Sequence, residues 1–121
     1  YLLSELDGVA SVPVINVDKD DFALRTDVVH LLKKVSLNQE ALLFMDEATS
    51  MIESHANSKT LSLHLVDHNR LSVKQQHWEA HVMDIIDHHK DEGLCPNVPS
   101  AKRNIVFPQG SCCSLVCQYA H

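Results

Sequence analysis

The chain has 121 residues and a mass of 13.6 kDa, the size of one small domain or of a piece of a larger protein. Hydrophobic residues make up 45% of it and charged residues 21%, a balance that excludes a disordered chain and predicts a buried core. The net charge of -6 disfavours binding to the phosphate backbone of nucleic acids, and no apolar run approaches the roughly 20 residues of a membrane span. We therefore expect neither a nucleic-acid partner nor a membrane partner.

The cysteines favour an intracellular protein. Cys112, Cys113 and Cys117 crowd near the C-terminus and Cys95 stands apart, which is a poor framework for disulfide bonds. This usage predicts a reducing compartment, and we expect a cytoplasmic protein. The N-terminus has neither an initiator Met nor the features of a secretion signal, so we expect the chain to begin inside a larger protein.

The first half of the chain predicts helices and strands in alternation. Residues 1–7 are typical of the end of a helix, because a glycine follows them. Residues 9–17 are rich in β-branched side chains and predict a strand. Apolar residues recur at helical spacing over residues 24–35, which predicts an amphipathic helix. A short strand at residues 41–45 and a helix at residues 47–55 complete this half.

The second half predicts strands at residues 60–66, 82–86 and 105–107. Residues 70–80 are long enough for the crossover helix that parallel strands require, and another helix is expected from Ser111 to the end. The alternation as a whole predicts an α/β fold with a mostly parallel, doubly wound sheet and flanking helices.

Five further residues have simple structural interpretations. Cys113 and Cys117, four positions apart in the last predicted helix, favour a buried helical face, because thiols suit a protein core. His77 and His81 have the same spacing, but two imidazoles without a third ligand are typical of a solvated surface. Trp78 is expected in the core.

The candidate metal-ligating and catalytic residues stand in two similar tripeptides, Asp-His-Asn at residues 67–69 and Asp-His-His at residues 87–89. Each follows a predicted strand, and parallel sheets bind ligands beyond the carboxyl ends of their strands. If the two strands are neighbours, the carboxylates of Asp67 and Asp87 lie about 5 Å apart, and like charges that close require a cation. Carboxylate oxygens with imidazole nitrogens suit Mn²⁺ or, with more water, Mg²⁺. One such pair is common by chance, whereas two favour a metal site.

The tripeptides also carry a family resemblance. Leu-Val-Asp-His-Asn at residues 65–69, followed by Ile-Ile-Asp-His-His at residues 85–89, resembles the DHH phosphoesterases, and most of all their exopolyphosphatase and prune branch. Further blocks that resemble the same branch stand at residues 12–16, 24–28, 110–112 and 114–116. The resemblance therefore extends over most of the chain.

The resemblance implies metal-dependent hydrolysis of phosphoanhydride bonds in inorganic polyphosphate or pyrophosphate, with two Mn²⁺ or Mg²⁺ ions in the complete protein. Carried over by motif, Asp67 bridges the two ions, His88 is a metal ligand, and Asp87 is a further ligand or orients the imidazoles. His89 is expected to face a substrate phosphate, so the catalytic residues implied are Asp67, His88 and His89. Substrate contacts are expected at His89, His68, Arg25 and Ser111. Ser111 is equally typical of a plain helix N-cap, since it stands at the start of the last predicted helix.

Two parts of the family pattern are missing from this sequence. The first metal motif, Asp-x-Asp after a strand, is not represented by Glu5-Leu6-Asp7, because no predicted strand precedes these residues. The second, C-terminal domain of the family is missing as well. We therefore expect residues 1–121 to be a partial DHH catalytic domain that is inactive by itself. The alternatives are a truncated, catalytically inactive prune-like protein that acts by binding unidentified partners, and an inorganic pyrophosphatase of the same superfamily.

Overall fold

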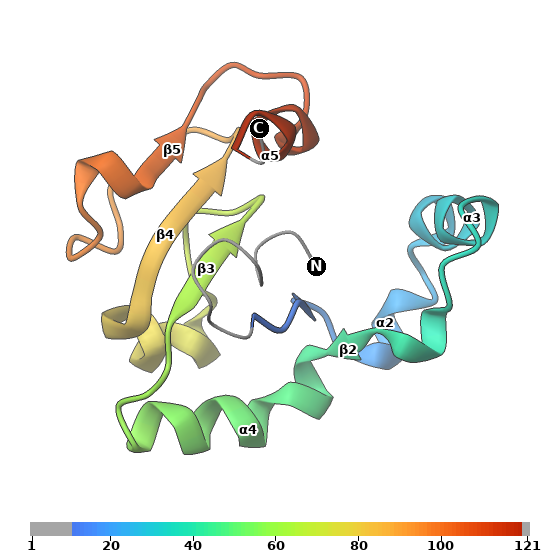
Figure 1. Ribbon diagram of the computed structural model, residues 1–121, viewed down its shortest axis with the longest axis horizontal. Coiled ribbons are helices and arrows are strands. Elements are labelled where there is room, and N and C mark those ends of the chain that lie inside the picture. Colours follow the sequence, from blue (N-terminus) through green and yellow to red (C-terminus); the bar gives the residue numbers. More distant parts are fainter. Residues whose placement is uncertain (1–10, 120–121) are drawn as a thin grey trace. The chain divides into compact units, whose positions relative to one another are not determined.

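The computed structural model describes residues 11–119 and divides the chain into two compact units at the junction of Asn57 and Ser58 (Figure 1). Each unit is described by itself. The helix end predicted at residues 1–7 lies outside the described residues. Among the described residues, no helix is long and apolar enough to span a membrane.

The sheet of the first unit has two short parallel strands, β1 (Val14–Ile15) and β2 (Leu43–Phe44). The strand predicted at residues 9–17 is therefore confined to β1 within the described part of the chain. Pro13 directly precedes β1 and has no N–H group to donate to a strand ladder. The strand predicted at residues 41–45 is also shorter than expected, because a helix begins directly after β2.

The first unit also contains α2 (Lys19–Phe22), α3 (Thr26–Lys34) and α4 (Met45–Asn57). The helices predicted at residues 24–35 and 47–55 are confirmed by α3 and α4, whereas α2 was not predicted, because a single turn shows no periodicity. No residue of α3 is buried, so its apolar stripe is left uncovered by the described residues.

The core of the first unit forms where α2 and α4 meet the short sheet. The rings of Phe22 and Phe44 pack at a tilt of 57°, with their centroids 5.1 Å apart. Glu47 secures this contact, because its carboxylate accepts hydrogen bonds from the backbone N–H of Phe44 at 3.3 Å and from Lys19 Nζ at 2.6 Å. The same carboxylate therefore ties the start of α4 both to β2 and to α2.

The second unit contains a three-stranded parallel sheet in the order β3 (Leu63–Val66), β4 (Val82–Asp87) and β5 (Arg103–Ile105). The central strand β4 is the most buried, and Ile85 within it has no accessible surface. The three arrowheads point the same way in Figure 1, so the carboxyl ends of the strands lie at one edge of the sheet. Both tripeptides follow strands at this edge.

The strand predicted at residues 82–86 is confirmed, whereas the other two predicted strands of this unit have different bounds. The strand predicted at residues 60–66 begins only at Leu63, and the strand predicted at residues 105–107 ends at Ile105. Arginine and asparagine open β5, and these polar residues hide the strand from a pattern based on apolar side chains. The helix that follows, α5 (Cys112–Tyr119), lies where the sequence predicted one.

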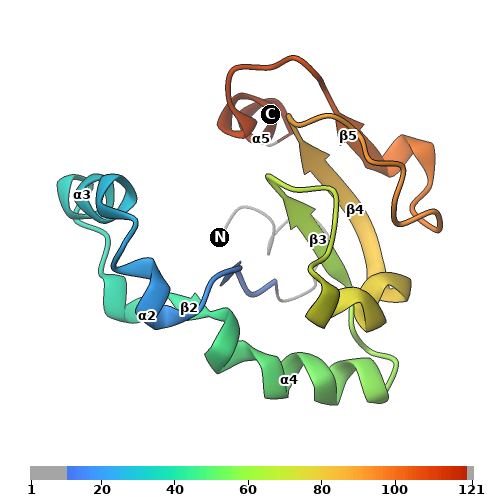
Figure 2. The same ribbon diagram turned by 180° about the vertical axis from the view of Figure 1, so that it is seen from behind.

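A 3₁₀-helix at Val73–His81 precedes β4, where the sequence predicted a crossover helix at residues 70–80. Figure 2 shows this segment in yellow, at the start of β4. A 3₁₀-helix has about three residues per turn, so His77 and His81, four positions apart, do not share one face. Trp78 is 3% exposed and belongs to the core, as predicted.

The thiols of α5 are arranged differently from the prediction. Cys112 and Leu115 pack with Ile86 of β4 in a buried hydrophobic cluster. Cys113 and Cys117 are exposed, so the prediction that they form a buried face was wrong. Positions three apart, such as 112 and 115, lie on one face of a helix, and here this face covers the sheet.

The α/β class with parallel strands and flanking helices is confirmed. The sequence predicted a single doubly wound sheet, whereas the described strands pair as two small sheets, one in each unit. Only the sheet of the second unit carries the two tripeptides.

Candidate metal centre

The first tripeptide begins at Asp67, directly after β3. The backbone N–H of Asp67 donates to the carbonyl oxygen of Ile86 in β4 at 2.9 Å, which continues the pairing of the two strands. The φ angle of Asp67 is 68°, in the left-handed region that residues with a side chain seldom adopt. The chain turns at this residue, and 60% of the surface of the Asp67 side chain stays accessible.

The second tripeptide begins at Asp87, the last residue of β4, whose side chain is completely buried. One carboxylate oxygen, Oδ1, accepts hydrogen bonds from the backbone N–H of His88 at 2.8 Å and from Nδ1 of His89 at 2.8 Å. The other oxygen, Oδ2, accepts a hydrogen bond of 2.6 Å from Nδ2 of Asn69. Asp87 therefore holds the residues that follow it.

The imidazoles of His88 and His89 lie side by side, with their ring centroids 4.3 Å apart. Nδ1 of His88 lies 2.8 Å from the carbonyl oxygen of Gln109, and Nδ1 of His89 lies 2.8 Å from the Asp87 carboxylate. A carbonyl and a carboxylate can only accept, so we assign the Nδ1 protons to these bonds. Each neutral ring then keeps its lone pair on Nε2. Metal-binding histidines are characteristically oriented in this way.

Three ligand atoms converge on one point at this edge of the sheet. Nε2 of His88 lies 3.2 Å from Oδ1 of Asp67. Asp67, His88 and His89 each offer one ligand atom, and these three atoms lie within 4.8 Å of one another. A lone pair on Nε2 cannot donate to a carboxylate, so a proton or a metal cation is needed between them. The residues present therefore fit a divalent cation.

The hydrogen bond between Asp87 and His89 favours the charged form of each residue. Burial raises the pKa of Asp87, but hydrogen bonds from His89, from Asn69 and from two backbone N–H groups outweigh burial and hold this pKa below its ordinary value. The hydrogen bond to Asp87 raises the pKa of His89 above its ordinary value. Asp87 is therefore a stable carboxylate at neutral pH, suited to orienting the imidazole.

Oδ1 of Asp67 and Nε2 of His88 lie 3.2 Å apart, and His89 belongs to the same group, while the roles of these residues as metal ligands stay predictions. The resemblance implied that His89 faces a substrate phosphate, a role that stays a prediction, and one ring nitrogen of His89 belongs to the converging group. Asp87 is not a member of this group, and its carboxylate faces His89 and Asn69. This geometry agrees with the orienting role, one of the two that the resemblance implied for Asp87.

Three of the predicted substrate contacts, His68, Ser111 and Arg25, are not members of the converging group. Nδ1 of His68 lies 3.0 Å from the carbonyl oxygen of Val66, in the strand that His68 follows. Ser111 Oγ accepts a hydrogen bond of 3.2 Å from the backbone N–H of Cys113, which is the plain N-cap role. Arg25 is exposed and lies in the first unit. Their contacts with substrate stay predictions.

Three residues with a role at this edge were not identified from the sequence. Asn69 stands in the first tripeptide, but its partners were not predicted. Gln109 acts through its backbone carbonyl, which every residue has, so no sequence signal could reveal it. Cys112 Sγ donates to the carbonyl oxygen of Ile86 at 3.4 Å, and burial raises the pKa of this thiol. The thiol therefore packs beneath the carbonyl that also receives the N–H of Asp67.

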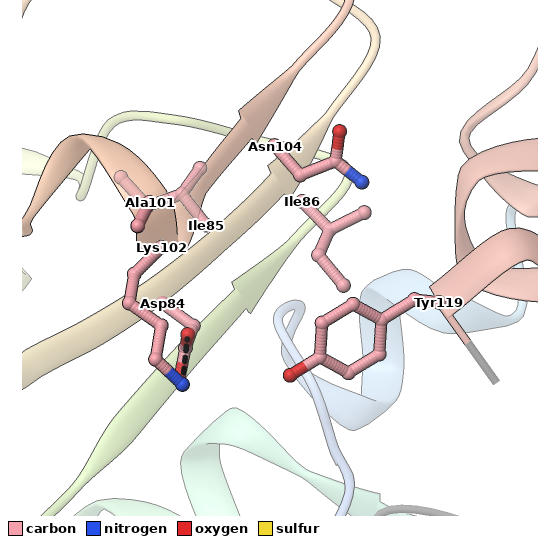
Figure 3. Close-up of a pocket in the computed structure, with 7 residues that line it drawn as sticks. All are labelled: Asp84, Ile85, Ile86, Ala101, Lys102, Asn104 and Tyr119. Carbon is pink, nitrogen blue, oxygen red and sulfur yellow. Dashed lines mark ion pairs between the residues drawn. The ribbon is translucent and has the colours of Figure 1, made fainter.

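The second unit also has a pocket that contains none of the converging ligand atoms (Figure 3). Its wall includes Ile86 and the ring of Tyr119, and its rim carries Asp84 and Lys102. The Asp84 carboxylate is already paired, with Lys102 at 3.4 Å and with Nδ1 of His64 at 2.8 Å. Asp84 is thus occupied by neighbouring basic groups, and it lies outside the group of converging ligand atoms.

Comparisons with known proteins agree with the resemblance of the sequence blocks. No protein-family model matches the chain. A Schizosaccharomyces pombe protein named "Putative exopolyphosphatase" is 33% identical over 113 residues, which are 93% of this chain and 28% of that protein. "Exopolyphosphatase PRUNE1" of Homo sapiens is 35% identical over 108 residues, and the protein of that name from Bos taurus is 33% identical over 110 residues.

The likeness covers most of this chain and a minor part of each relative. The human and bovine alignments take in 87% and 88% of the chain, and 22% of each relative. The chain therefore spans between a fifth and a third of the length of these curated relatives. Over that part, it is similar to proteins named exopolyphosphatase, which indicates the exopolyphosphatase and prune branch.

Proposed function

We propose that this chain supplies one side of a divalent-metal centre in a hydrolase that cleaves the phosphoanhydride bonds of inorganic polyphosphate. The observation that carries the proposal is the convergence of Asp67, His88 and His89 within 4.8 Å, at the carboxyl edge of a parallel sheet. The names of the curated relatives support the substrate class.

In this proposal the ion is held by Oδ1 of Asp67 and by Nε2 of His88 and His89. Gln109 and Asp87 orient the two imidazoles from behind, at the Nδ1 atoms. Two nitrogen ligands with one carboxylate favour Mn²⁺, because Mg²⁺ prefers an all-oxygen environment. The chemistry that such an ion supplies is polarisation of phosphate oxygens and activation of water near neutral pH.

The negative charge of the chain bears on how a polyanionic substrate would be attracted. With a net charge of -6, the chain repels a polyanion such as polyphosphate. A divalent cation held by Asp67, His88 and His89 would reverse the local sign of the field, so these residues would attract the polyanion through the bound ion. A second ion, as the resemblance implies, needs further ligands, because the described residues contain one group of three converging ligand atoms.

The test is Mn²⁺ binding by the chain, measured by electron paramagnetic resonance of free Mn²⁺, together with phosphate release from short polyphosphates. Asp67→Ala and His88→Ala are expected to weaken Mn²⁺ binding strongly. His77→Ala is the matched control, because His77 is an exposed imidazole of the same unit outside the converging group. Equal Mn²⁺ affinity in the wild type and both site variants would refute the proposal.

The substrate and the catalytic competence are tested by the same phosphate assay on a protein that contains this chain. Faster cleavage of pyrophosphate than of longer polyphosphates would identify the pyrophosphatase alternative. Mn²⁺ binding without phosphate release from any chain length would identify the inactive, partner-binding alternative. For the 121 residues alone we expect binding without turnover, since three protein ligands hold one ion.

A further inference from the structure

Asn69 is a buried polar residue beside the candidate metal centre that the proposed function does not use. It is 4% exposed, although it lies in a loop at the edge of the sheet. Its Nδ2 donates to Oδ2 of Asp87 at 2.6 Å and to the carbonyl oxygen of Lys90 at 3.1 Å. Its Oδ1 accepts from the backbone N–H of Glu92 at 3.1 Å. A single amide therefore joins the loop after β3 to the loop after β4.

The bond to Asp87 fixes the rotation of that carboxylate. One oxygen of Asp87 faces Nδ1 of His89, and Asn69 holds the opposite oxygen. Without the Asn69 donor, Oδ2 would be a buried acceptor without this partner, and the carboxylate could rotate to recover a hydrogen bond. Such a rotation would remove Oδ1 from His89 and release the imidazole.

Two ion pairs also join these loops, the Asp67–His88 pair of the candidate metal centre and the pair of Arg70 with Glu92, and the second is a weak substitute for this amide. Arg70 lies 3.0 Å from Glu92, but the two side chains are 62% and 48% exposed. Exposed pairs of this kind contribute little, because water competes for both charges. The buried bonds of Asn69 therefore join the two loops where water is excluded, while Arg103 also holds the second loop through Asp91 and the carbonyl oxygen of Leu94.

We propose that Asn69 is a positioning residue of the metal centre, which fixes Asp87 and through it the Nε2 atom of His89. An asparagine suits this place because its amide offers a donor to a carboxylate and an acceptor to a backbone N–H at once. The proposal rests on the proposed function as far as the metal is concerned. The orientation of His89 can be measured without any metal.

The test uses Asn69→Asp and Asn69→Ser, with Gln75→Ala as control. Aspartate preserves the volume of Asn69 but replaces its donor by an oxygen that faces the Asp87 carboxylate. Serine is the second variant in case aspartate prevents folding. Gln75 is another buried amide of the same unit, bonded to Ser72 at 2.9 Å and outside the metal centre. Circular dichroism first establishes that each variant is folded.

Two readouts separate positioning from general stability. The first is the tautomer of His89, read from the ring ¹⁵N shifts of metal-free protein at a pH above the His89 pKa. The wild type and Gln75→Ala are expected to keep the proton on Nδ1, whereas the Asn69 variants are expected to lose this preference. The second is Mn²⁺ affinity, expected to fall about tenfold or more in the Asn69 variants.

Each outcome decides between the two proposals. A wild type that does not bind Mn²⁺ would overturn the proposed function, while the tautomer would still report on positioning. Asn69 variants that keep the wild-type tautomer of His89 would overturn the positioning role. Failure of both Asn69 variants to fold, while Gln75→Ala folds, would overturn it too, because Asn69 would then be a residue of general stability.

Discussion

The two tripeptides at the ends of β3 and β4 begin with the same two residues, aspartate and histidine, but the structure gives the two aspartates different surroundings. Asp67 keeps 60% of its side-chain surface and directs its carboxylate to Nε2 of His88. Asp87 is completely buried and accepts hydrogen bonds from its own loop and from Asn69. One aspartate is therefore free to bind a cation, whereas the other holds the imidazoles in place.

The two histidines differ in the same way. Nδ1 of His68 lies 3.0 Å from the carbonyl oxygen of Val66, only two residues earlier in the chain. Nδ1 of His88 lies 2.8 Å from the carbonyl oxygen of Gln109, which is distant in the sequence. The long-range bond fixes His88 against a second segment. A repeated motif thus acquires separate roles from its neighbours in space, which the repeat itself does not encode.

The largest expected effect comes from Asp67, the exposed aspartate. Asp67→Ala removes a ligand, so we expect Mn²⁺ affinity, and phosphate release by a protein that contains this chain, to fall about 100-fold or more. The free energy of unfolding should fall by about 1 kcal/mol at most, because the side chain is exposed and the only added cost is the left-handed φ, which alanine tolerates less well than aspartate. Mn²⁺ titration and urea unfolding measure the two effects. A strongly destabilised variant with normal affinity would reverse the roles assigned to the two aspartates.

Asp87, the buried aspartate, should show the opposite balance. Asp87→Asn replaces one carboxylate oxygen by an amide donor that opposes the donor of either Asn69 or His89, so the free energy of unfolding, measured in urea without metal, should fall by about 2 kcal/mol. Mn²⁺ affinity should fall about 10- to 100-fold, because His89 loses its orientation. Unchanged stability in this variant would contradict the burial and the hydrogen bonds described for Asp87.

The pH dependence of stability sharpens the same contrast. The pKa of Asp87 lies below its ordinary value of 3.8, so its hydrogen bonds stabilise the fold above that pH and are lost as the pH falls through the folded-state value. The pKa of His89 lies above its ordinary value of 6.5, so its contribution is present below that pH and is lost as the pH rises through the raised value. The Asp87–His89 bond should therefore stabilise the fold most between these limits.

This prediction is measured by urea unfolding in chelator over a series of pH values. Asp87→Asn should flatten the acid side of the wild-type profile, and His89→Ala should flatten the alkaline side. A wild-type profile that both variants leave unaltered would show that the bond between Asp87 and His89 contributes nothing to stability.

The sequence predicted the second unit better than the first, and burial explains the difference. The central strand β4 is apolar because both of its faces are covered, so its pattern was clear. In the first unit, β1 is two residues long and α3 buries no residue, so local patterns carried little information about packing. The exposed thiols of α5 were misjudged for a related reason: periodicity shows that positions share a face, but not which face meets the sheet.

The candidate site was predictable as far as residue type and strand position allowed. Asp67 and His88 were placed together because each follows a parallel strand. The separation of ligand from positioning residue was not predictable, because it depends on the left-handed turn at Asp67 and on the Asn69 amide. The bond of His88 to the carbonyl oxygen of Gln109 was not predictable from the sequence, since every residue has a backbone carbonyl.

The smallest expected effect belongs to His68, the histidine whose Nδ1 partner is local. His68→Ala removes a contact with the Val66 carbonyl and no converging ligand atom, so Mn²⁺ affinity should change less than about threefold. His88→Ala, the matched variant in the second loop, should weaken Mn²⁺ binding at least as strongly as Asp87→Asn. If His68 contacts a substrate phosphate, its loss should raise KM for polyphosphate in a protein that contains this chain and leave kcat nearly unchanged, because uniform binding affects KM alone. Equal losses of Mn²⁺ affinity in His68→Ala and His88→Ala would show that His68 is as important for metal binding as His88, and that the contrast between the two histidines is wrong.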